Sequence, residues 1–262
     1  MRESLVLHAE ILWPALLAGL LVLSTHVPLG REVLRRGIIF MDLAIAQVAA
    51  LGLIMASALG LGGHDDQGAL WQNLIAMGAA IVGAMLLYSF RRLEARIQEA
   101  LIGSLFMLAA TGSLLLLAAD PHGGERLKEL LVGQILWVQP MDLLGTGVVY
   151  ALVLGLWCGL RQRLGDWLFY PLFAVTITLS TQLVGVYLVF SSLIIPALAT
   201  LRSERPLLPA YLIGFVAYLT GLVVSALCDL PSGAMIAWCL AATAVLYYAV
   251  IGRFFAASYK SS

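Results

Sequence analysis

Charged residues are scarce in this 262-residue chain, and their scarcity excludes most classes of protein. Asp, Glu, Lys and Arg together make up 11% of the sequence, against roughly 25% in an ordinary soluble domain. The formal net charge is +0, so the chain lacks the basic surface that nucleic-acid binding requires. The 3 cysteines lie within or beside apolar runs, which predicts packed thiols instead of a disulfide framework.

Long apolar runs take the place of the missing charge, because 61% of the residues are hydrophobic. Most runs approach the ~20 residues that cross a bilayer as a helix, and they are apolar on all sides, unlike the alternating strands of a barrel. We therefore expect an all-α fold, a polytopic transmembrane bundle of about 8–9 helices in a single domain over residues 1–262. The runs are 11–29, 37–60, 69–90, 99–119, 141–160, 167–190, 191–201, 207–227 and 231–252.

One apolar stretch, from Trp167 to Leu201, is too long for one span and short for two. Interrupted helices of this kind occur where backbone is buried in protein or lines a cavity. We interpret the stretch as a full span over 167–190 followed by a short or re-entrant helix over 191–201. The residues expected to break a helix or line a pathway there are Gly185, Ser191, Ser192 and Pro196.

The basic residues predict the direction of the spans. Lys and Arg concentrate on the cytoplasmic side of membrane proteins, and 12 of the 15 fall on one set of alternate connections and the C-terminal tail. This pattern places the N-terminus outside and the C-terminus inside, provided that the short helix crosses the membrane. The twelve are Arg31, Arg35, Arg36, Arg91, Arg92, Arg96, Arg161, Arg163, Arg202, Arg205, Arg253 and Lys260.

Asp42 is the acidic residue best placed within a span, and ionisable residues there are functional candidates. Carboxylate and amide oxygens suit hard or borderline divalent cations, so Asp42 and Gln47 are candidate ligands. A spacing of five puts them about 140° apart on a straight helix. The alternative is that Asp42 pairs with Arg36. His26 is a third candidate, unless a backbone carbonyl satisfies its ring.

The sequence has no GxxxxGK[ST] phosphate-binding loop, so we expect no nucleotide hydrolysis by that route and no enzyme activity. Energy for any transport would come from an ion gradient or from a separate subunit.

Four stretches occur in an order that points to one family. Arg35-Arg36 precedes Asp42 and Gly52, and the other three stretches lie at 129–142, 183–200 and 221–234. Together they resemble the metal-type ABC importer permeases, the integral membrane subunits that import zinc, manganese or iron. The resemblance covers most of the chain.

The resemblance implies partners, a cargo and a place in the cell. It implies a homodimer of permeases in the bacterial inner membrane, a cytoplasmic ABC ATPase subunit, and an extracytoplasmic metal-binding protein. A divalent metal, zinc or manganese with iron a further candidate, would pass near Asp42 as cargo, and no cofactor would be bound permanently. Gly52, Gly185 and Pro196 would allow close helix approach and a broken helix near that path.

Two departures from the family pattern leave alternatives open. Relatives often carry a histidine four residues after the aspartate, where this chain has Ala46. Either Gln47 takes that role or the ligand is absent, which weakens the case for zinc. Relatives also have a longer cytoplasmic stretch where this chain has residues 161–166. Either a shortened contact through Arg161, Arg163 and Asp166 couples to the ATPase, or the partner is modified.

Two other functions therefore remain open from the sequence. One is a gradient-driven metal transporter or channel descended from such permeases, which the short inner connection favours. The other is a membrane scaffold that transports nothing.

Overall fold

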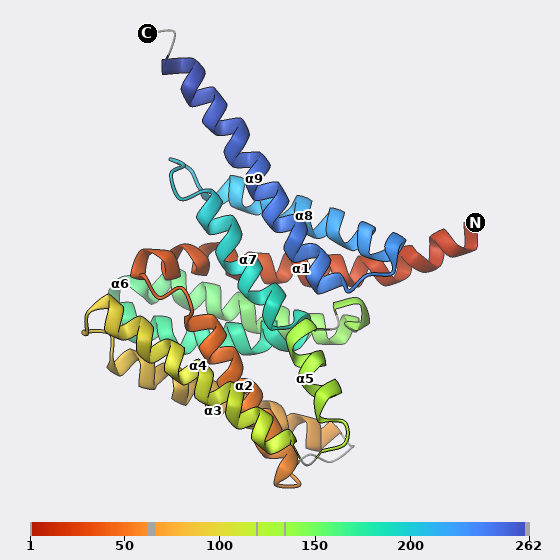
Figure 1. The fold of residues 1–262 in the computed structure, drawn as a ribbon, viewed down its shortest axis with the longest axis vertical. Helices are drawn as coiled ribbons and strands as arrows, with labels where there is room; N and C mark the ends of the chain where they lie inside the picture. Colours follow the sequence, from red (N-terminus) through yellow and green to blue (C-terminus); the bar gives the residue numbers. More distant parts are fainter. Residues whose placement is uncertain (1, 62–65, 119, 134, 260–262) are drawn as a thin grey trace.

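The computed structural model describes residues 2–61, 66–118, 120–133 and 135–259, and within these ranges the chain forms helices and no strands (Figure 1). The all-α prediction is confirmed. In chain order the elements are α1 (Arg2–Arg36), α2 (Met41–Ala58), α3 (Asp66–Ser89), α4 (Ala95–Leu117), α5 (Gly123–Val132), the 3-10 turn η1 (Ile135–Trp137), α6 (Pro140–Val184), α7 (Val186–Ala199), α8 (Leu207–Cys228) and α9 (Ser232–Tyr259).

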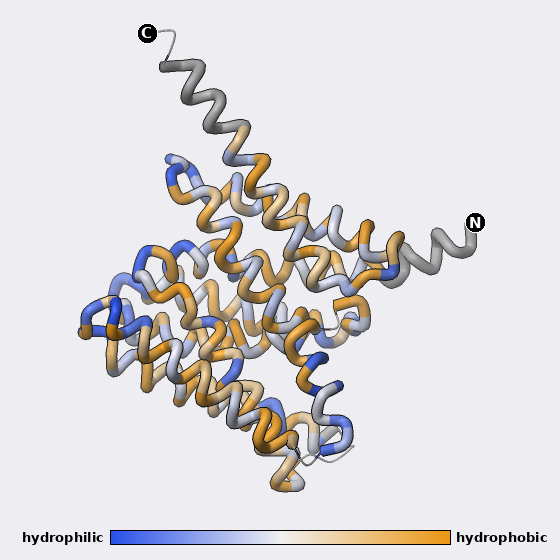
Figure 2. Tube along the Cα trace, in the orientation of Figure 1, coloured by the Kyte–Doolittle hydropathy of each residue, from blue (hydrophilic) through white to orange (hydrophobic). Residues whose placement is uncertain are grey.

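The helices are long and apolar enough for a polytopic membrane bundle. Seven of the described helices could cross a membrane by length and composition, with α6 counted once. However, α6 contains a non-helical residue, Gly165, with φ 49° and ψ −122°, which divides it into two halves at 140–164 and 166–184. Polar residues concentrate at the helix ends and connections, and apolar residues fill the middle of the bundle (Figure 2).

Helix α1 extends further than the apolar run predicts. It continues through Pro28 to Arg36, whereas the run ends at residue 29. A proline inside a helix costs about 3 kcal/mol. Burial offsets this cost, because Val27, Leu29 and Val33 around the proline are all within 1% of full burial.

The break in the 167–201 stretch lies at Gly185, six residues before the predicted boundary. Gly185 has φ 81° and ψ 160°, a region that only glycine adopts readily. Gly133, at the end of α5, has φ 72° and ψ 172° and lies against it. A Cβ on Gly185 would lie 2.6 Å from the Gly133 Cα, so this contact requires two glycines.

The predicted break at Ser191 and Ser192 was wrong, because both residues lie inside α7. The Ser191 hydroxyl donates to the Tyr187 carbonyl at 2.8 Å, and the Ser192 hydroxyl donates to the Leu188 carbonyl at 2.6 Å. These bonds satisfy the hydroxyls within the helix. Pro196 also lies inside α7 and does not end it. As break-forming residues, Ser191, Ser192 and Pro196 are therefore excluded.

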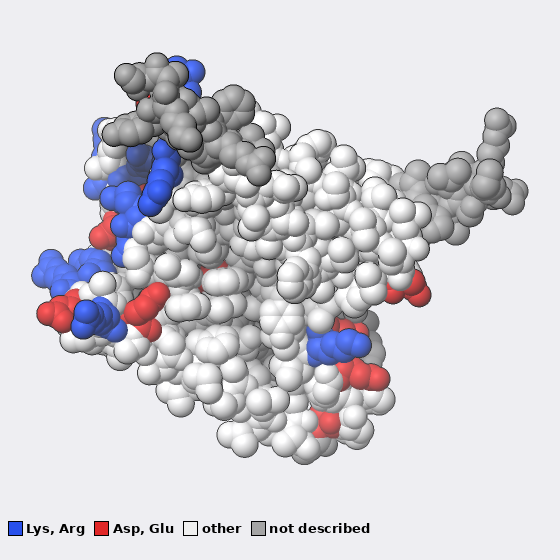
Figure 3. All heavy atoms as spheres, turned by 45° about the horizontal axis from the view of Figure 1, so that its top comes forward, with Lys and Arg blue, Asp and Glu red and all other residues white. Residues whose placement is uncertain are grey.

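Helix α7 crosses the bundle and does not turn back. It begins at Gly185 beside Gly133 and ends in the basic turn that holds Arg202 and Arg205. Its 14 residues span about 21 Å at 1.5 Å per residue. The basic turns after α1, α3 and α7 and at the α6 kink gather along one edge of the molecule (Figure 3). This gathering agrees with the alternation of sides that the charge pattern predicts.

The Gly133–Gly185 contact predicts a large penalty for any side chain there. We expect Gly185→Ala to destabilise the protein by about 3 kcal/mol or more, because the backbone region disfavours L residues and the Cβ meets backbone atoms. The thermal midpoint of the detergent-solubilised protein measures this. Gly159→Ala on α6 is the matched control, since a Cβ there meets nothing within 4 Å. Equal midpoints for the two variants would show that the close approach is not required.

Candidate metal site

Asp42 lies in the first turn of α2 and is almost completely buried. Its exposed fraction is 1%, and neither carboxylate oxygen has a hydrogen-bond partner among the described residues. The alternative pairing with Arg36 is not formed, because Arg36 contacts Glu32 and Asp166 instead. Burial of a carboxylate without a partner is costly. Among the described residues, no positive group bonds to the Asp42 carboxylate to compensate its charge.

Gln47 is also buried, with 4% exposed, but it does not share a face with Asp42. The residues that follow Asp42 on its side of α2, at helical spacing, are Ala46, Ala49, Leu53 and Ser57. Gln47 points about 140° away from that face. The position where relatives carry histidine is thus an alanine on the Asp42 face, and the structure does not bring Gln47 to Asp42.

His26 lies inside α1, ten residues before the helix ends, and is fully buried. Its Nδ1 is 3.3 Å from the Thr25 hydroxyl, and its Nε2 has no partner among the described residues. His26 shares a face of α1 with Gly19, which packs on the Tyr218 ring, and Gly30, which packs on the Leu193 carbonyl. This face of α1 packs against α7 and α8. Within the described residues, α1 and α2 have no extended contact.

The three predicted ligands therefore do not form one assembled site within the chain. In the described part of the chain, no group of three or more His, Cys, Asp or Glu residues is positioned to hold a metal ion. The metal-binding roles of Asp42, Gln47 and His26 stay predictions.

Glu99 on α4 is a carboxylate that the sequence analysis missed. Its Oε2 is buried without a partner, and its carboxylate lies beside the backbone N–H groups of Ile39 and Phe40, just before α2. In the sequence, Glu99 is the first residue of an apolar run and follows Arg96, so it resembles an ordinary interfacial acid. Its position at the start of an apolar run was the available signal.

Arg36 holds the end of α1 to the kink in α6. Its Nε donates to a Glu32 oxygen at 2.9 Å, and its guanidinium contacts the Asp166 carboxylate at 2.5 Å. The same group lies 4.1 Å from the centre of the Phe169 ring. Arg36 is only 13% exposed, so these contacts are partly shielded from water.

The predicted ATPase-contact segment is therefore a helix end and a kink. Arg161 and Arg163 are exposed in the last turn before Gly165, and Asp166 follows it. Behind them, the Gln98 side chain donates to the Tyr170 hydroxyl at 3.2 Å, and the Tyr88 and Tyr170 rings meet edge to face at 5.5 Å. These contacts join α3 and α4 to the kink. The coupling role of Arg161, Arg163 and Asp166 stays a prediction.

A polar cavity opens at the far end of α2. Its volume is about 500 Å³, and its walls come from α2, α3, α5 and α6. Gln72 donates to the Ser57 hydroxyl at 3.0 Å within this wall. Leu53 and Ser57 belong to the Asp42 face of α2, so cavity and carboxylate lie along one side of the helix, about 17–22 Å apart at 1.5 Å per residue. Arg126, Glu129, Thr181 and Gln182 also line it.

Two further features bear on a pathway. Gly52 lies where α2 and α3 meet, and a Cβ on it would be 2.8 Å from the Ala79 Cβ. The predicted close approach at Gly52 is therefore present, whereas its role in a pathway stays a prediction.

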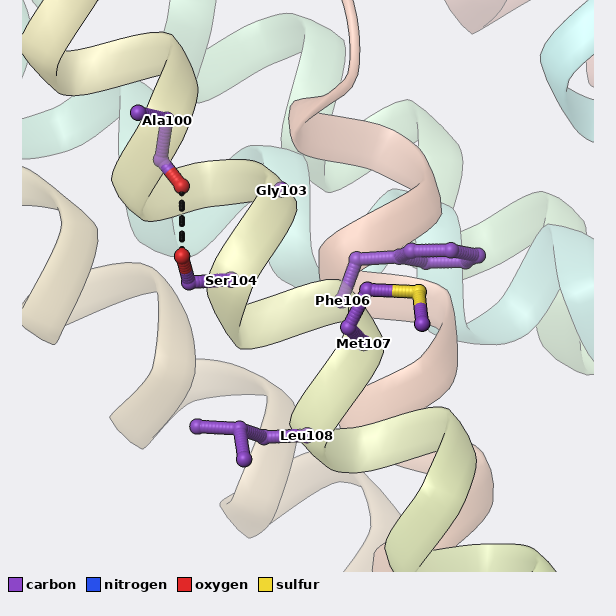
Figure 4. Close-up of a pocket in the computed structure, with 6 residues that line it drawn as sticks. All are labelled: Ala100, Gly103, Ser104, Phe106, Met107 and Leu108. Carbon is purple, nitrogen blue, oxygen red and sulfur yellow. Dashed lines mark hydrogen bonds between the residues drawn. The ribbon is translucent and has the colours of Figure 1, made fainter.

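A second hollow runs along one side of α4, where the Ser104 hydroxyl bonds to the Ala100 carbonyl of its own helix (Figure 4). All the residues that line this hollow lie on α4, and the Ser104 hydroxyl is already bonded within that helix. The hollow therefore offers few free ligands to a cation.

Comparisons with known proteins agree with this fold. The model of the ABC 3 transport family matches residues 8–165 and 157–251, and the two matches overlap over 157–165, the stretch that ends at the α6 kink. The structure is similar to PsaBC from Streptococcus pneumoniae in complex with Fab, with a TM-score of 0.73, 19% identity and 95% of each chain covered. It is also similar to an inward-facing metal-chelate type ABC transporter, with a TM-score of 0.63, 20% identity, and 89% of this chain and 84% of that chain covered. The chain is a multi-pass membrane protein that belongs to the ABC 3 transport family.

Proposed function

We propose that this chain is the permease subunit of an ATP-driven importer that moves a divalent metal cation, zinc or manganese, across the bacterial inner membrane. The observation that carries the proposal is Asp42, a buried carboxylate without a partner in a chain of an ABC transport family. A bare divalent cation cannot cross hydrocarbon, so protein ligands must replace its water at a constriction. Asp42 would provide one such ligand.

The Asp42 face of α2 supports a route for the cation. Ala46 and Ala49 are the small residues on this face between the cavity and Asp42, and both are packed in the core, so the route along them is closed in this structure. A hydrated ion would enter at the cavity, where side-chain oxygens can replace part of its water. It would then lose its remaining water on the way to Asp42. The metal is cargo on this route, and the protein needs no permanently bound cofactor.

The number of ligands supports a homodimer. Zinc usually takes four protein or water ligands, and manganese prefers six oxygen ligands. Within the described residues, one chain has no group of three or more His, Cys, Asp or Glu side chains that could hold a metal ion. A second copy of the permease would supply further ligands if the two α2 helices faced each other.

Energy and delivery require two other partners. Because the sequence has no phosphate-binding loop, a cytoplasmic ABC ATPase subunit would hydrolyse the nucleotide. Its contact would include Arg161 and Arg163, which are exposed beside the kink. An extracytoplasmic metal-binding protein would deliver the ion at the cavity.

Removing the charge of Asp42 should stop transport. We expect Asp42→Asn to lower uptake of Mn²⁺ and Zn²⁺ at least about tenfold, because an amide is a weaker cation ligand than a carboxylate. Uptake is measured in proteoliposomes that contain the permease, its ATPase and its binding protein. Asp142→Asn is the matched control, since Asp142 is exposed at the start of α6.

Unchanged uptake in Asp42→Asn would contradict the proposal and favour a scaffold. Uptake without nucleotide that Asp42→Asn abolishes would instead favour the gradient-driven alternative. Strict dependence on ATP would exclude that alternative.

Releasing the α6 kink should weaken coupling more than stability. Asp166→Ala removes the Arg36 contact, and the loss of unfolding free energy should be under about 1 kcal/mol, because Asp166 is half exposed. We expect several-fold less metal transported per ATP hydrolysed, since Arg36 then holds the kink to α1 only through its contact with the Phe169 ring. The measurement is metal uptake and ATP hydrolysis in the same proteoliposomes.

Glu204→Ala is the control for this variant, because Glu204 is an exposed acid in another turn of the same basic edge. If both variants transport equal metal per ATP, the Arg36–Asp166 contact has no part in coupling.

A further inference from the structure

The polar cavity at the far end of α2 has a carboxylate in its wall that the fold leaves unpaired. Glu129, on α5, lines the cavity, and its side chain has no hydrogen bond or ion pair within the described residues. Arg126, the cation of the same wall, is already paired, because its guanidinium lies 3.2 Å from the Asp120 carboxylate. These three side chains together carry a net charge of −1. Such a wall attracts cations and disfavours anions.

The amide side chains of the wall are held by their nitrogen atoms. The Gln72 amide nitrogen donates to the Ser57 hydroxyl at 3.0 Å. The Gln182 amide nitrogen donates to the Asn73 side-chain oxygen at 3.1 Å. Neither glutamine carbonyl oxygen has a partner among the described residues. The Thr181 hydroxyl donates to a backbone carbonyl of its own helix, so its oxygen can still accept. The wall therefore offers several free acceptors to an occupant of the cavity.

The size of the cavity favours an ion that keeps its water. Six waters occupy roughly 180 Å³ at about 30 Å³ each, and the cavity volume is about 500 Å³. A bare divalent ion needs its oxygen ligands within about 2.0–2.6 Å, and this cavity is too wide to bring several wall atoms that close at once. A hydrated ion presents only O–H donors, because each water binds the metal through its oxygen. The free acceptors of the wall complement those donors.

We propose that the cavity binds the divalent cation in its hydrated form. The Glu129 carboxylate is the charged anchor, and the Gln72 and Gln182 carbonyl oxygens accept from the metal-bound waters. This proposal rests on the proposed function for the identity of the ion and deepens it, because the ion then has a binding site before any of its water is exchanged. Contacts through bound water recognise charge and hydrated size, which Mn²⁺ and Mg²⁺ share. The cavity therefore does not distinguish these ions, and selection takes place where the water is lost.

Hexaamminecobalt(III) is the probe that tests this mode of binding. Its six ammonia ligands do not exchange, and they present N–H donors in the octahedral arrangement of a hydrated divalent ion. The probe can therefore occupy a site that binds through metal-bound water, but it cannot coordinate a side chain directly. We expect it to inhibit Mn²⁺ uptake by proteoliposomes that contain the permease, its ATPase and its binding protein, and to be displaced by excess Mg²⁺.

Two variants test the anchor and the acceptors separately. Glu129→Gln removes the charge and should weaken the inhibition at least about threefold. Gln182→Leu keeps the charge, removes one acceptor and should weaken it about twofold or more. Glu125→Gln is the matched control, because Glu125 is an exposed glutamate of α5 that is not among the residues lining the cavity. At physiological ionic strength, charges more than about 8 Å apart are largely screened, so this control should be inhibited as the unmodified protein is.

The position of the probe is measured directly in crystals of the permease–ATPase complex soaked with hexaamminecobalt(III). Data collected at the cobalt absorption edge locate the metal. The proposal predicts an anomalous peak in the cavity, roughly 4–5 Å from the Glu129 carboxylate oxygens, because an ammonia ligand lies between cobalt and oxygen. The peak should be lost in the Glu129→Gln variant. The absence of a cavity peak in the unmodified complex at saturating probe would overturn the proposal.

These outcomes separate the hydrated-cation site from the proposed function. If Asp42→Asn abolishes Mn²⁺ uptake but the probe neither inhibits uptake nor gives a cavity peak, the proposed function stands and the hydrated-cation site is overturned. Equal inhibition of the unmodified protein and of Glu129→Gln would place the probe elsewhere in the assembly and would also overturn the site. If the complex transports neither Mn²⁺ nor Zn²⁺, the proposed function fails, and the cobalt peak alone decides whether the cavity binds hydrated cations.

Discussion

The free energy of a carboxylate buried without a counter-charge dominates the interpretation of this bundle. Removing a charge from water costs several kcal/mol even after relaxation, and an apolar bundle offers little to compensate it. Asp42 carries this cost at the start of α2, where the partial positive charge of the helix end offsets part of it. The proposed cation cargo would compensate this charge while it is bound, and this would be a reason for the protein to keep such a residue.

The backbone around α2 is shaped by residues that lack a side chain. Gly133 lies at the end of α5, and Gly185 lies between α6 and α7. Because neither has a side chain, these two segments come into close contact beside the polar cavity. Gly165 bends α6 at the opposite edge, where Arg36 ties the bend to the end of α1. The cavity and the ion-paired edge thus lie at the two ends of α2. Movement at the bend would reach the start of α2 through only six residues, from Arg36 to Asp42.

Hydropathy and charge were enough to predict the helical bundle, the alternation of its basic turns and the burial of Asp42. These features depend on composition over whole segments, which a single sequence contains. Local boundaries were harder to predict. The sequence offered both Gly185 and the Ser191–Ser192 pair as breaks, and only the contact with Gly133, 52 positions away, selects Gly185. Helix α1 continues past Pro28 because α1 is buried in tertiary contacts that no local signal reveals.

Glu99 shows the same limit at the candidate site. Its sequence neighbours indicate an interfacial acid, and only the packing of α4 along α2 brings it to Ile39 and Phe40. The absence of imidazole at Ala46 was visible in the sequence, but its meaning was not, because Gln47 could have replaced it. Helix α2 is continuous from Met41 to Ala58, so Gln47 lies about 140° from Asp42 as its spacing indicated, and its role as a ligand stays a prediction.

The location of bound cargo tests the central claim most directly. The experiment is a crystal structure of the permease–ATPase complex soaked with Mn²⁺, with data collected at the manganese absorption edge. The anomalous signal locates the ion without any assumption about which residues bind it. The account predicts an anomalous peak within roughly 2.5 Å of an Asp42 carboxylate oxygen. Peaks confined to the loops at the cavity end, with none at the start of α2 at saturating Mn²⁺, would contradict it.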